Sequence, residues 1–254
     1  MTKSSLRGAA AQGAQQQRDN LCGPFQVARV LRESGIEEWD GEGLDQDLIA
    51  VRAGTLLPDL PAEQCVPAGA ESLLDYRHEL PVVPPERAGT SPKELAGAIE
   101  DASDGTLRAI PLRARWSAGR IVRVASFAPE LGARLIANLR TGCLWGSRPP
   151  MESVLAELAG RPVDGPPAEW DVGHYVELVA LVRGRGGSLV AVRDTYPGLG
   201  WNGVHLQPPR ALAAALERDD GREGGVLCVV PADAAGKVEG LGFEIGFWDN
   251  GTRR

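Results

Sequence analysis

The sequence predicts a protein of mixed helices and strands, and two segments carry most of that prediction. Residues 22–34 read CGPFQVARVLRES, in which Phe25, Ala28 and Leu31 recur at the spacing of one helix face. Residues 173–196 read GHYVELVALVRGRGGSLVAVRDTY, with two apolar, β-branched runs on either side of a glycine-rich turn. An amphipathic helix and a distant β-hairpin therefore share one chain of 254 residues, which is long enough to bury a sizeable core.

The first helix has recognisable signals at both ends. Pro24 suits the first helical turn, where the missing N–H of proline is not needed. Gly35 follows the last apolar position, where many helices end in a left-handed residue. These signals place Cys22 at the N-terminal end of the helix.

The rest of the chain holds shorter elements. Ser91 and Glu94 form a capping box around Pro92, so a helix is predicted from Pro92 to about Ser103. The remaining pattern predicts, in chain order, strands at 106–115 and 120–127, helices at 129–139 and 151–159, a loop at 160–167, a helix at 209–218 and a buried strand at 225–230.

The hairpin relates two polar residues to each other. If its turn at 183–187 is centred near Arg185, the numbers of facing residues sum to roughly 370. Asp194 then faces Val176, and His174 is its diagonal neighbour on the same face of the sheet. Diagonal neighbours lie about 7–8 Å apart, within reach of an aspartate–imidazole hydrogen bond. A shift of one residue in the turn would move Asp194 to the other face.

The composition excludes several classes of protein. With 34 Asp and Glu against 27 Lys and Arg, the net charge is −7, whereas a nucleic-acid partner requires a basic surface. No apolar run approaches the roughly 18–20 residues of a membrane span, and residues 1–17 lack the apolar stretch of a secretory signal. The sequence thus predicts a cytoplasmic protein without a nucleic-acid or membrane partner, and a disordered tail at 1–15.

Cysteine and histidine are scarce in this chain. The thiols and imidazoles are Cys22, Cys65, Cys143 and Cys228, and His78, His174 and His205. Four thiols without a C-x-x-C motif indicate neither a disulfide scaffold nor a metal site, and no cofactor is predicted. No partner pattern surrounds Cys65, Cys143, Cys228, His78 or His205, so structural roles are expected for them.

Nucleophilic chemistry by a thiol sets three requirements. A helix N-terminus or an imidazolium stabilises the attacking thiolate, which favours Cys22. A histidine must take the thiol proton and return it to the leaving group, and His174 at the start of a strand is the candidate. A third group orients that imidazole, and the hairpin register offers Asp194.

These residues also resemble a known family. Gln16-x5-Cys22-Gly-Pro, followed far downstream by Gly-His174-Tyr-Val and by Asp194 on the next strand, is similar to the motifs of papain-like cysteine peptidases. The resemblance is greatest to bacterial double-glycine leader peptidases, which process bacteriocins, and to their stand-alone relatives. It implies an α+β fold in which the nucleophile helix packs on an antiparallel β-sheet. The chain departs from this family in the interval of 152 residues between Cys22 and His174, which is long and predicts an insertion. In that superfamily a Gln six residues before the Cys donates to the oxyanion, which corresponds to Gln16.

The resemblance further implies one papain-like domain at 16–254, in which residues 36–170 form an elaborated segment such as a lid or a substrate-recognition subdomain. Gln16 is selected as the donor by spacing alone, because Gln15 and Gln17 flank it. Asn202 is an alternative to Asp194 as the orienting residue, because papain uses an Asn near a Trp and Asn202 follows Trp201.

The expected reaction is acyl transfer through a thioester on Cys22, with a peptide or amide as substrate and water as the acceptor. Two alternatives remain open. An amine acceptor would make the enzyme an amide-forming acyltransferase or a transglutaminase-like ligase, and a protein that keeps the fold but not the reactivity would be a binding protein. The sequence indicates neither the substrate nor the oligomeric state.

Overall fold

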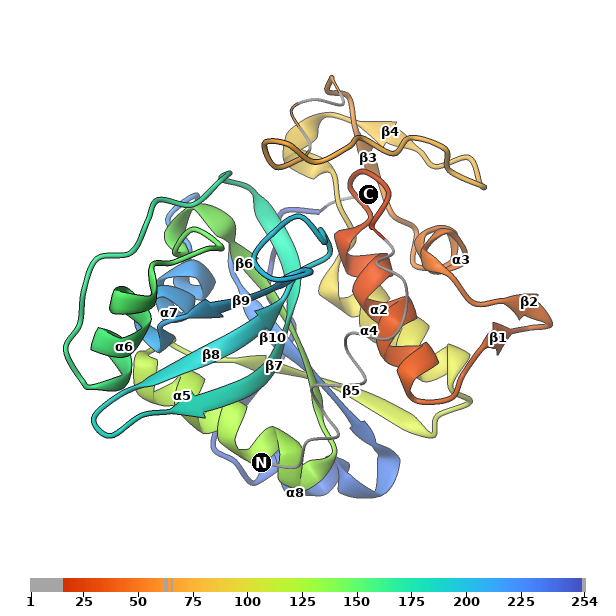
Figure 1. Ribbon diagram of the computed structural model, residues 1–254. Coiled ribbons are helices and arrows are strands. Elements are labelled where there is room, and N and C mark those ends of the chain that lie inside the picture. Colours follow the sequence, from red (N-terminus) through yellow and green to blue (C-terminus); the bar gives the residue numbers. More distant parts are fainter. Residues whose placement is uncertain (1–15, 62–63, 65, 253–254) are drawn as a thin grey trace.

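The structure of the protein, a computed structural model, describes residues 16–61, 64 and 66–252. Its centre is a seven-stranded antiparallel β-sheet with the order β11-β5-β10-β6-β7-β8-β9 (Figure 1). The strands are β5 (Leu107–Arg113), β6 (Arg134–Arg140), β7 (Gly173–Arg183), β8 (Ser188–Arg193), β9 (Val204–Gln207), β10 (Gly225–Pro231) and β11 (Glu244–Ile245). The predicted tail at 1–15 and Cys65 lie outside the described residues.

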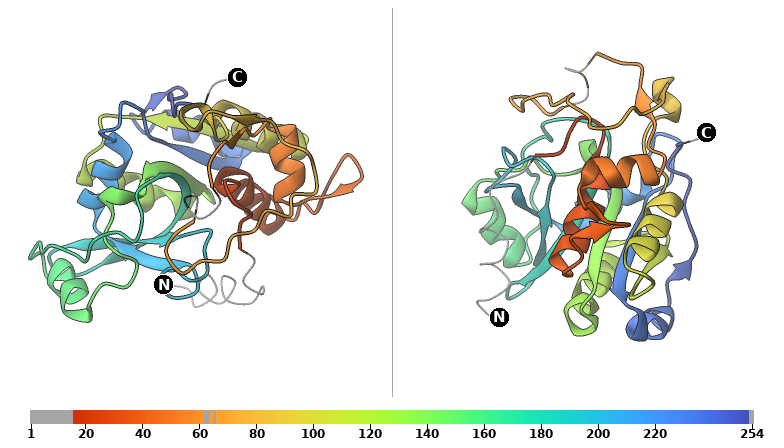
Figure 2. Two further views of the ribbon diagram at one scale, coloured as in Figure 1. Left: turned by 90° about the horizontal axis from the view of Figure 1, so that it is seen from above. Right: turned by 90° about the vertical axis from the view of Figure 1, so that its right-hand side faces the viewer.

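Helices cover both faces of this sheet, as the views in Figures 1 and 2 show. They are α2 (Cys22–Glu33), α4 (Pro92–Ala102), α5 (Ala118–Phe127) and α7 (Pro209–Glu217). Helices α2 and α4 share a core with Tyr175, whereas α5 and α7 share one with the next residue, Val176. Successive residues of a strand point to opposite faces, and β5, β6, β7 and β10 contribute to both cores. The α+β class is thereby confirmed, with the helix that begins at Cys22 packed on an antiparallel sheet.

The remaining elements are short. They are α3 (Gln46–Arg52), α6 (Met151–Leu158), α8 (Ala235–Glu239), the 3₁₀ helices at Pro85–Arg87, Ala128–Leu131, Thr141–Cys143 and Ala232–Ala234, the pair β1 (Glu38–Trp39) and β2 (Glu42–Gly43), and the parallel pair β3 (Leu57–Pro58) and β4 (Val82–Val83). Most of the small elements between Cys22 and β5 lie beside α2 in Figure 1, outside the central sheet. Strands β5 and β6 also come from the segment 36–170, and they lie inside the central sheet.

Most of the predicted elements are confirmed. The helix at 22–34 is α2, and Gly35 follows it with a φ of 86°. The helix from Pro92 is α4, and its N-cap Ser91 accepts a hydrogen bond from the N–H of Glu94. The strands predicted at 106–115 and 225–230 are β5 and β10, and the helices predicted at 151–159 and 209–218 are α6 and α7.

Two predictions are wrong. Residues 120–127, predicted as a strand, belong to α5, which Ser117 caps by accepting a hydrogen bond from the N–H of Arg120. Residues 129–139, predicted as a helix, consist of a 3₁₀ turn followed by β6. Strand β6 lies between β10 and β7 and is buried from Leu135 to Leu139, so its apolar run lacks the alternation that identifies a strand.

The hairpin of β7 and β8 reaches its predicted register by an unpredicted route. Next to the turn, Arg183 pairs with Ser188, a sum of 183 + 188 = 371 that would place Asp194 opposite Glu177. A β-bulge between Leu178 and Ala180 inserts one residue into β7, after which Glu177 pairs with Arg193 and the sum is 177 + 193 = 370. The bulge therefore brings Asp194 to the face of His174.

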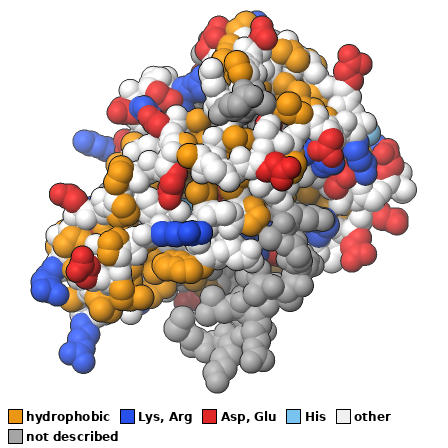
Figure 3. Space-filling view, turned by 45° about the horizontal axis from the view of Figure 1, so that its top comes forward, with side chains coloured by type: hydrophobic (Ala, Val, Ile, Leu, Met, Phe, Trp, Pro, Cys, Tyr) orange, Lys and Arg blue, Asp and Glu red, His pale blue; other side chains and the backbone are white. Residues whose placement is uncertain are grey.

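The surface agrees with the acidic composition. On the face shown in Figure 3, Lys and Arg side chains stand singly, while many Asp and Glu side chains lie at the upper and right-hand edges. Within the described ranges, the helices are all too short or too polar to cross a membrane.

Candidate active site

Three predicted site residues meet at one end of the sheet. Cys22 is the first residue of α2, His174 is the second residue of β7, and Asp194 directly follows β8. The His174 Nε2 lies 3.1 Å from Oδ1 of Asp194. The thiol of Cys22 lies close enough to the same imidazole to contribute to raising the pKa of His174. The thiol, the imidazole and the carboxylate therefore form a continuous row, although they come from three separate parts of the chain.

The imidazole and the carboxylate form a buried ion pair. Burial alone would lower the pKa of His174, but the Asp194 carboxylate and hydrogen bonds to Asp194 and Cys22 outweigh it and raise that pKa to about 10. Burial would likewise raise the pKa of Asp194, yet the charge of His174 and contacts with His174 and His205 hold it well below its usual range. Both shifts favour an imidazolium beside a carboxylate at neutral pH.

The hydrogen bonds that Asp194 accepts determine which nitrogen of His174 carries the proton between them. Oδ1 of Asp194 also accepts hydrogen bonds from the main-chain N–H groups of Thr195, at 2.7 Å, and Tyr196, at 3.2 Å. An ionised carboxylate only accepts hydrogen bonds, so Nε2 of His174 carries the proton that points at it. This assignment leaves Nδ1 as the ring nitrogen that is available to Cys22.

The start of α2 presents main-chain donors beside the thiol. The N-cap residue Leu21 forms no side-chain cap, and Pro24 has no N–H, so the first turn offers the N–H groups of Cys22 and Gly23. A Cβ on Gly23 would approach Leu95 to 2.7 Å and Tyr175 to 3.2 Å. Glycine therefore allows the nucleophile end of the helix to approach β7 closely.

The predicted oxyanion donor Gln16 makes its described side-chain hydrogen bond away from Cys22 and His174. Its side-chain amide donates a hydrogen bond to the carbonyl of Glu71, and among the described contacts none joins it to Cys22 or His174. Because an amide nitrogen carries two N–H groups, one donor of Gln16 remains for another acceptor. Gln17 is buried instead beside the row of Cys22, His174 and Asp194, where it accepts from Thr195 Oγ1 at 2.6 Å and donates to Tyr196 Oη at 2.9 Å. The role of Gln16 stays a prediction.

Asn202, the alternative orienting residue, does not contact His174 in the described structure. It is exposed and occupies a left-handed turn with a φ of 54°. Asp194 alone of the two contacts His174 in the described structure.

His205 is a neighbour of the site that sequence reasoning assigned a structural role. Strand β9 pairs His205 with Val192, which places it on the same face as Asp194. Its Nε2 lies 3.7 Å from Oδ2 of Asp194, while its Nδ1 accepts a hydrogen bond from Gln207 at 2.9 Å. Gln207 is fixed in turn by Trp145, whose main-chain N–H donates a hydrogen bond to Oε1 of the Gln207 side chain. His205 therefore presents a protonated Nε2 to the carboxylate.

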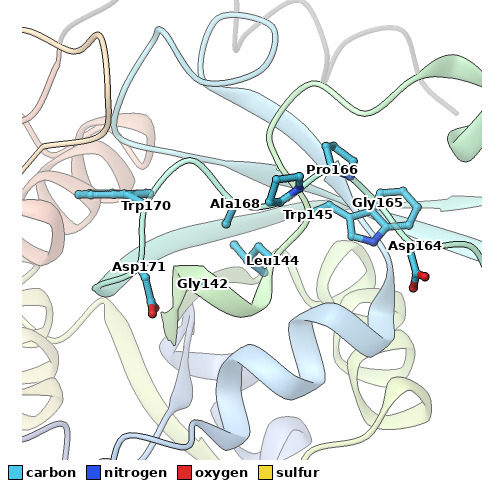
Figure 4. Close-up of a pocket in the computed structure, with 10 residues that line it drawn as sticks. Gly142, Leu144, Trp145, Asp164, Gly165, Pro166, Ala168, Trp170 and Asp171 are labelled. Carbon is cyan, nitrogen blue, oxygen red and sulfur yellow. The ribbon is translucent and has the colours of Figure 1, made fainter.

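A cavity of about 520 Å³ lies next to the site (Figure 4). It is lined by the segment 164–171 and by residues near the 3₁₀ helix at Thr141–Cys143. Trp170 joins this cavity to His174, because its ring centroid is 5.0 Å from that of His174 and 5.4 Å from that of Tyr196. The loop that precedes His174 thus shields the imidazole and borders the open space.

The other described thiols differ from Cys22, which is partly exposed. Burial raises the pKa of Cys228 to about 12. Burial, together with the carboxylate of Asp219, also raises the pKa of Cys143. Within the described residues, no group of three or more His, Cys, Asp and Glu is arranged to hold a metal ion.

The ion pair makes stability depend on pH in a defined direction. Since the pKa of His174 is raised from 6.5, its charge contributes stability that is fully present below about pH 6.5 and is lost as the pH rises through about 10. The lowered pKa of Asp194 contributes stability above about pH 4 that is lost as the pH falls. We therefore expect the melting-temperature deficit of His174→Gln to shrink between about pH 6 and about pH 10.5. A deficit that is the same at both pH values would contradict the ion pair.

A comparison with curated proteins finds no match to this chain. Residues 5–249 match a protein family that is described as a family of unknown function (DUF6885). Because the match covers nearly the whole chain, the protein belongs to the family of unknown function DUF6885.

Proposed function

We propose that this protein is a cytoplasmic, papain-like cysteine enzyme that hydrolyses a peptide or amide through a thioester on Cys22. The observation that carries the proposal is the row Cys22–His174–Asp194, in which a partly exposed thiol at a helix N-terminus lies beside a buried imidazole that is paired with a buried carboxylate. A buried ion pair can have a purely structural role, but here the imidazole of the pair also lies beside the thiol of Cys22, the proposed nucleophile.

In the proposed reaction, His174 is already an imidazolium at neutral pH, so its Nδ1 holds the proton of the Cys22 thiol and the sulfur attacks as a thiolate. The sulfur attacks the substrate carbonyl carbon, so that a C–S bond forms and the carbonyl oxygen becomes an oxyanion. The N–H groups of Cys22 and Gly23, and the amide of Gln16, are the proposed donors to that oxyanion. The imidazolium then gives its proton to the leaving nitrogen as the C–N bond breaks. His174 then takes a proton from water, whose oxygen attacks the thioester carbon; the C–S bond breaks, the acid is released, and the sulfur again lies beside the protonated His174.

The test is detection of the acyl-enzyme. The protein is incubated with candidate peptides or a cell extract, and intact mass shows whether an acyl group is added to Cys22. Product analysis with and without an added amine separates hydrolysis from transfer to an amine, because both routes share the thioester.

Alkylation by iodoacetamide distinguishes an enzyme from a binding protein of the same fold. We expect Cys22 to react rapidly well below pH 8 and before Cys143 and Cys228, whose raised pKa values keep them protonated. Peptide mapping of the alkylated protein gives the rate at each thiol. Slow reaction of Cys22 that rises only above pH 8 would contradict the proposal and favour the binding protein.

A further inference from the structure

The face of α2 that meets β7 and β8 is polar. Cys22, Gln26, Arg29 and Glu33 follow one another at intervals of four, three and four residues, so they form a single stripe along the helix. The apolar residues of the helix pack instead into the core shared with α4. The stripe thus begins at the nucleophile and continues with three polar side chains.

Two members of the stripe bind the main chain of the strands that carry the catalytic row. Gln26 is fully buried, and its Nε2 donates to the carbonyls of Tyr175, at 3.3 Å, and Arg193, at 3.2 Å. Arg29 donates from Nη1 to the carbonyl of Asp194, at 3.1 Å, and from Nη2 to that of Arg193, at 3.3 Å. Tyr175 follows His174 directly. The helix that carries the thiol therefore holds the main chain next to the imidazole and the main chain of the carboxylate residue.

A buried charge keeps Arg29 in this place. Its Nη2 lies 3.6 Å from Glu177, a carboxylate that is 1% exposed and is shared with Arg193 and Arg134. Burial lowers the pKa of Arg29 to about 10, so its guanidinium stays charged at neutral pH. Withdrawing Arg29 from the network would leave part of a buried negative charge unpaired, which is unfavourable.

We propose that Gln26 and Arg29 are positioning residues that set the separations among Cys22, His174 and Asp194 through these main-chain carbonyls. The proposal rests on the function proposed above, since reacting groups have to be held to about 0.5 Å. A displacement of about 1 Å can slow a reaction roughly 100-fold. Neither residue touches the reacting atoms, so both act only through the groups that do.

The experiment compares Arg29→Met and Gln26→Met with Arg134→Met. The Arg134 variant is a matched control. Arg134 forms ion pairs with Glu177 and Glu33 in the same network, but it binds neither of the main-chain carbonyls that Arg29 binds. Three readouts are taken at pH 7: the alkylation rate of Cys22, the downfield proton resonance of His174 Nε2–H, and the melting temperature. We expect alkylation roughly 10–100-fold slower and a shifted His174 resonance in Arg29→Met and Gln26→Met. The Arg134→Met control should have a lower melting temperature than the wild type but the same alkylation rate of Cys22 and the same His174 resonance.

The proposal is overturned if alkylation in all three variants falls only in step with the melting temperature, or if Arg29→Met leaves the His174 resonance in place. Gln26→Met, which removes no charge, decides the question if Arg29→Met does not fold. Failure of the proposed function gives a different result. Wild-type Cys22 would then react no faster than Cys143, while the His174 resonance would still report on positioning.

Discussion

Replacing Cys22 with alanine is expected to abolish the acyl-enzyme and to change the melting temperature by only a few degrees. The thiol is the proposed site of the covalent bond, so no other atom of the row can replace it. It is small and partly exposed, and substitutions at such positions usually alter stability by about 0.5 kcal/mol. Intact mass and thermal unfolding of the purified variant measure the two quantities.

The other described thiols supply the matched controls for this variant. Cys143→Ala and Cys228→Ala are expected to keep the adduct, because neither thiol contacts His174 in the described structure. Cys228 is fully buried in β10, so its variant should lose roughly 1 kcal/mol or more of stability. If Cys22→Ala instead lost stability and kept the adduct, Cys22 would be a structural thiol.

Replacing Asp194 with asparagine is expected to lower the rate of acyl-enzyme formation on the order of 10³-fold or more. The carboxylate is what raises the pKa of His174, and an amide has no charge with which to hold the imidazolium. An amide can also present an N–H to Nε2 of His174, which would reverse the proton assignment of the ring. Rates from intact mass, with the melting temperature recorded beside them, measure the effect.

The control for this second variant is Asn202→Gly, which keeps the left-handed turn because glycine favours a positive φ. Asn202 is exposed and makes no contact with His174 in the described structure, so its variant should react within about twofold of the wild type. Equal losses in Asp194→Asn and Asn202→Gly would contradict the assignment of Asp194.

The hairpin shows how a site can be predicted in the right place while its cause is missed. The two apolar runs and the glycine-rich turn indicated which strands pair, and a sum of roughly 370 placed Asp194 beside His174. The turn actually sets 371, and the bulge between Leu178 and Ala180 restores 370. A bulge depends on contacts that the residue pattern of one strand does not contain.

The misassigned elements have a different physical cause. Leu131 of the 3₁₀ turn and Leu135, Ile136 and Leu139 of β6 imitate the apolar face of a helix, whereas burial on both sides of a central strand produced the run in β6. In α5, isoleucine and valine favour strands by propensity, and only the cap at Ser117 and the packing at the sheet overcome that preference.

His205 and Gln17 escaped prediction because their relevance depends on tertiary neighbours. The β8–β9 register that brings His205 to Asp194 appears only once Val192 and His205 are known to pair. Gln17 was visible only as a neighbour of Gln16, and its contacts with Thr195 and Tyr196 join residues 178 and 179 positions apart. Local spacing carries no information about such distances.

The order of the row along the chain has a consequence during protein synthesis. The proposed nucleophile Cys22 is made first, and the proposed base His174 and orienting residue Asp194 follow 152 and 172 residues later. Helix α2 itself contains no histidine. A growing polypeptide would therefore carry an unassisted thiol until these residues are made and acquire its proposed reactivity only afterwards.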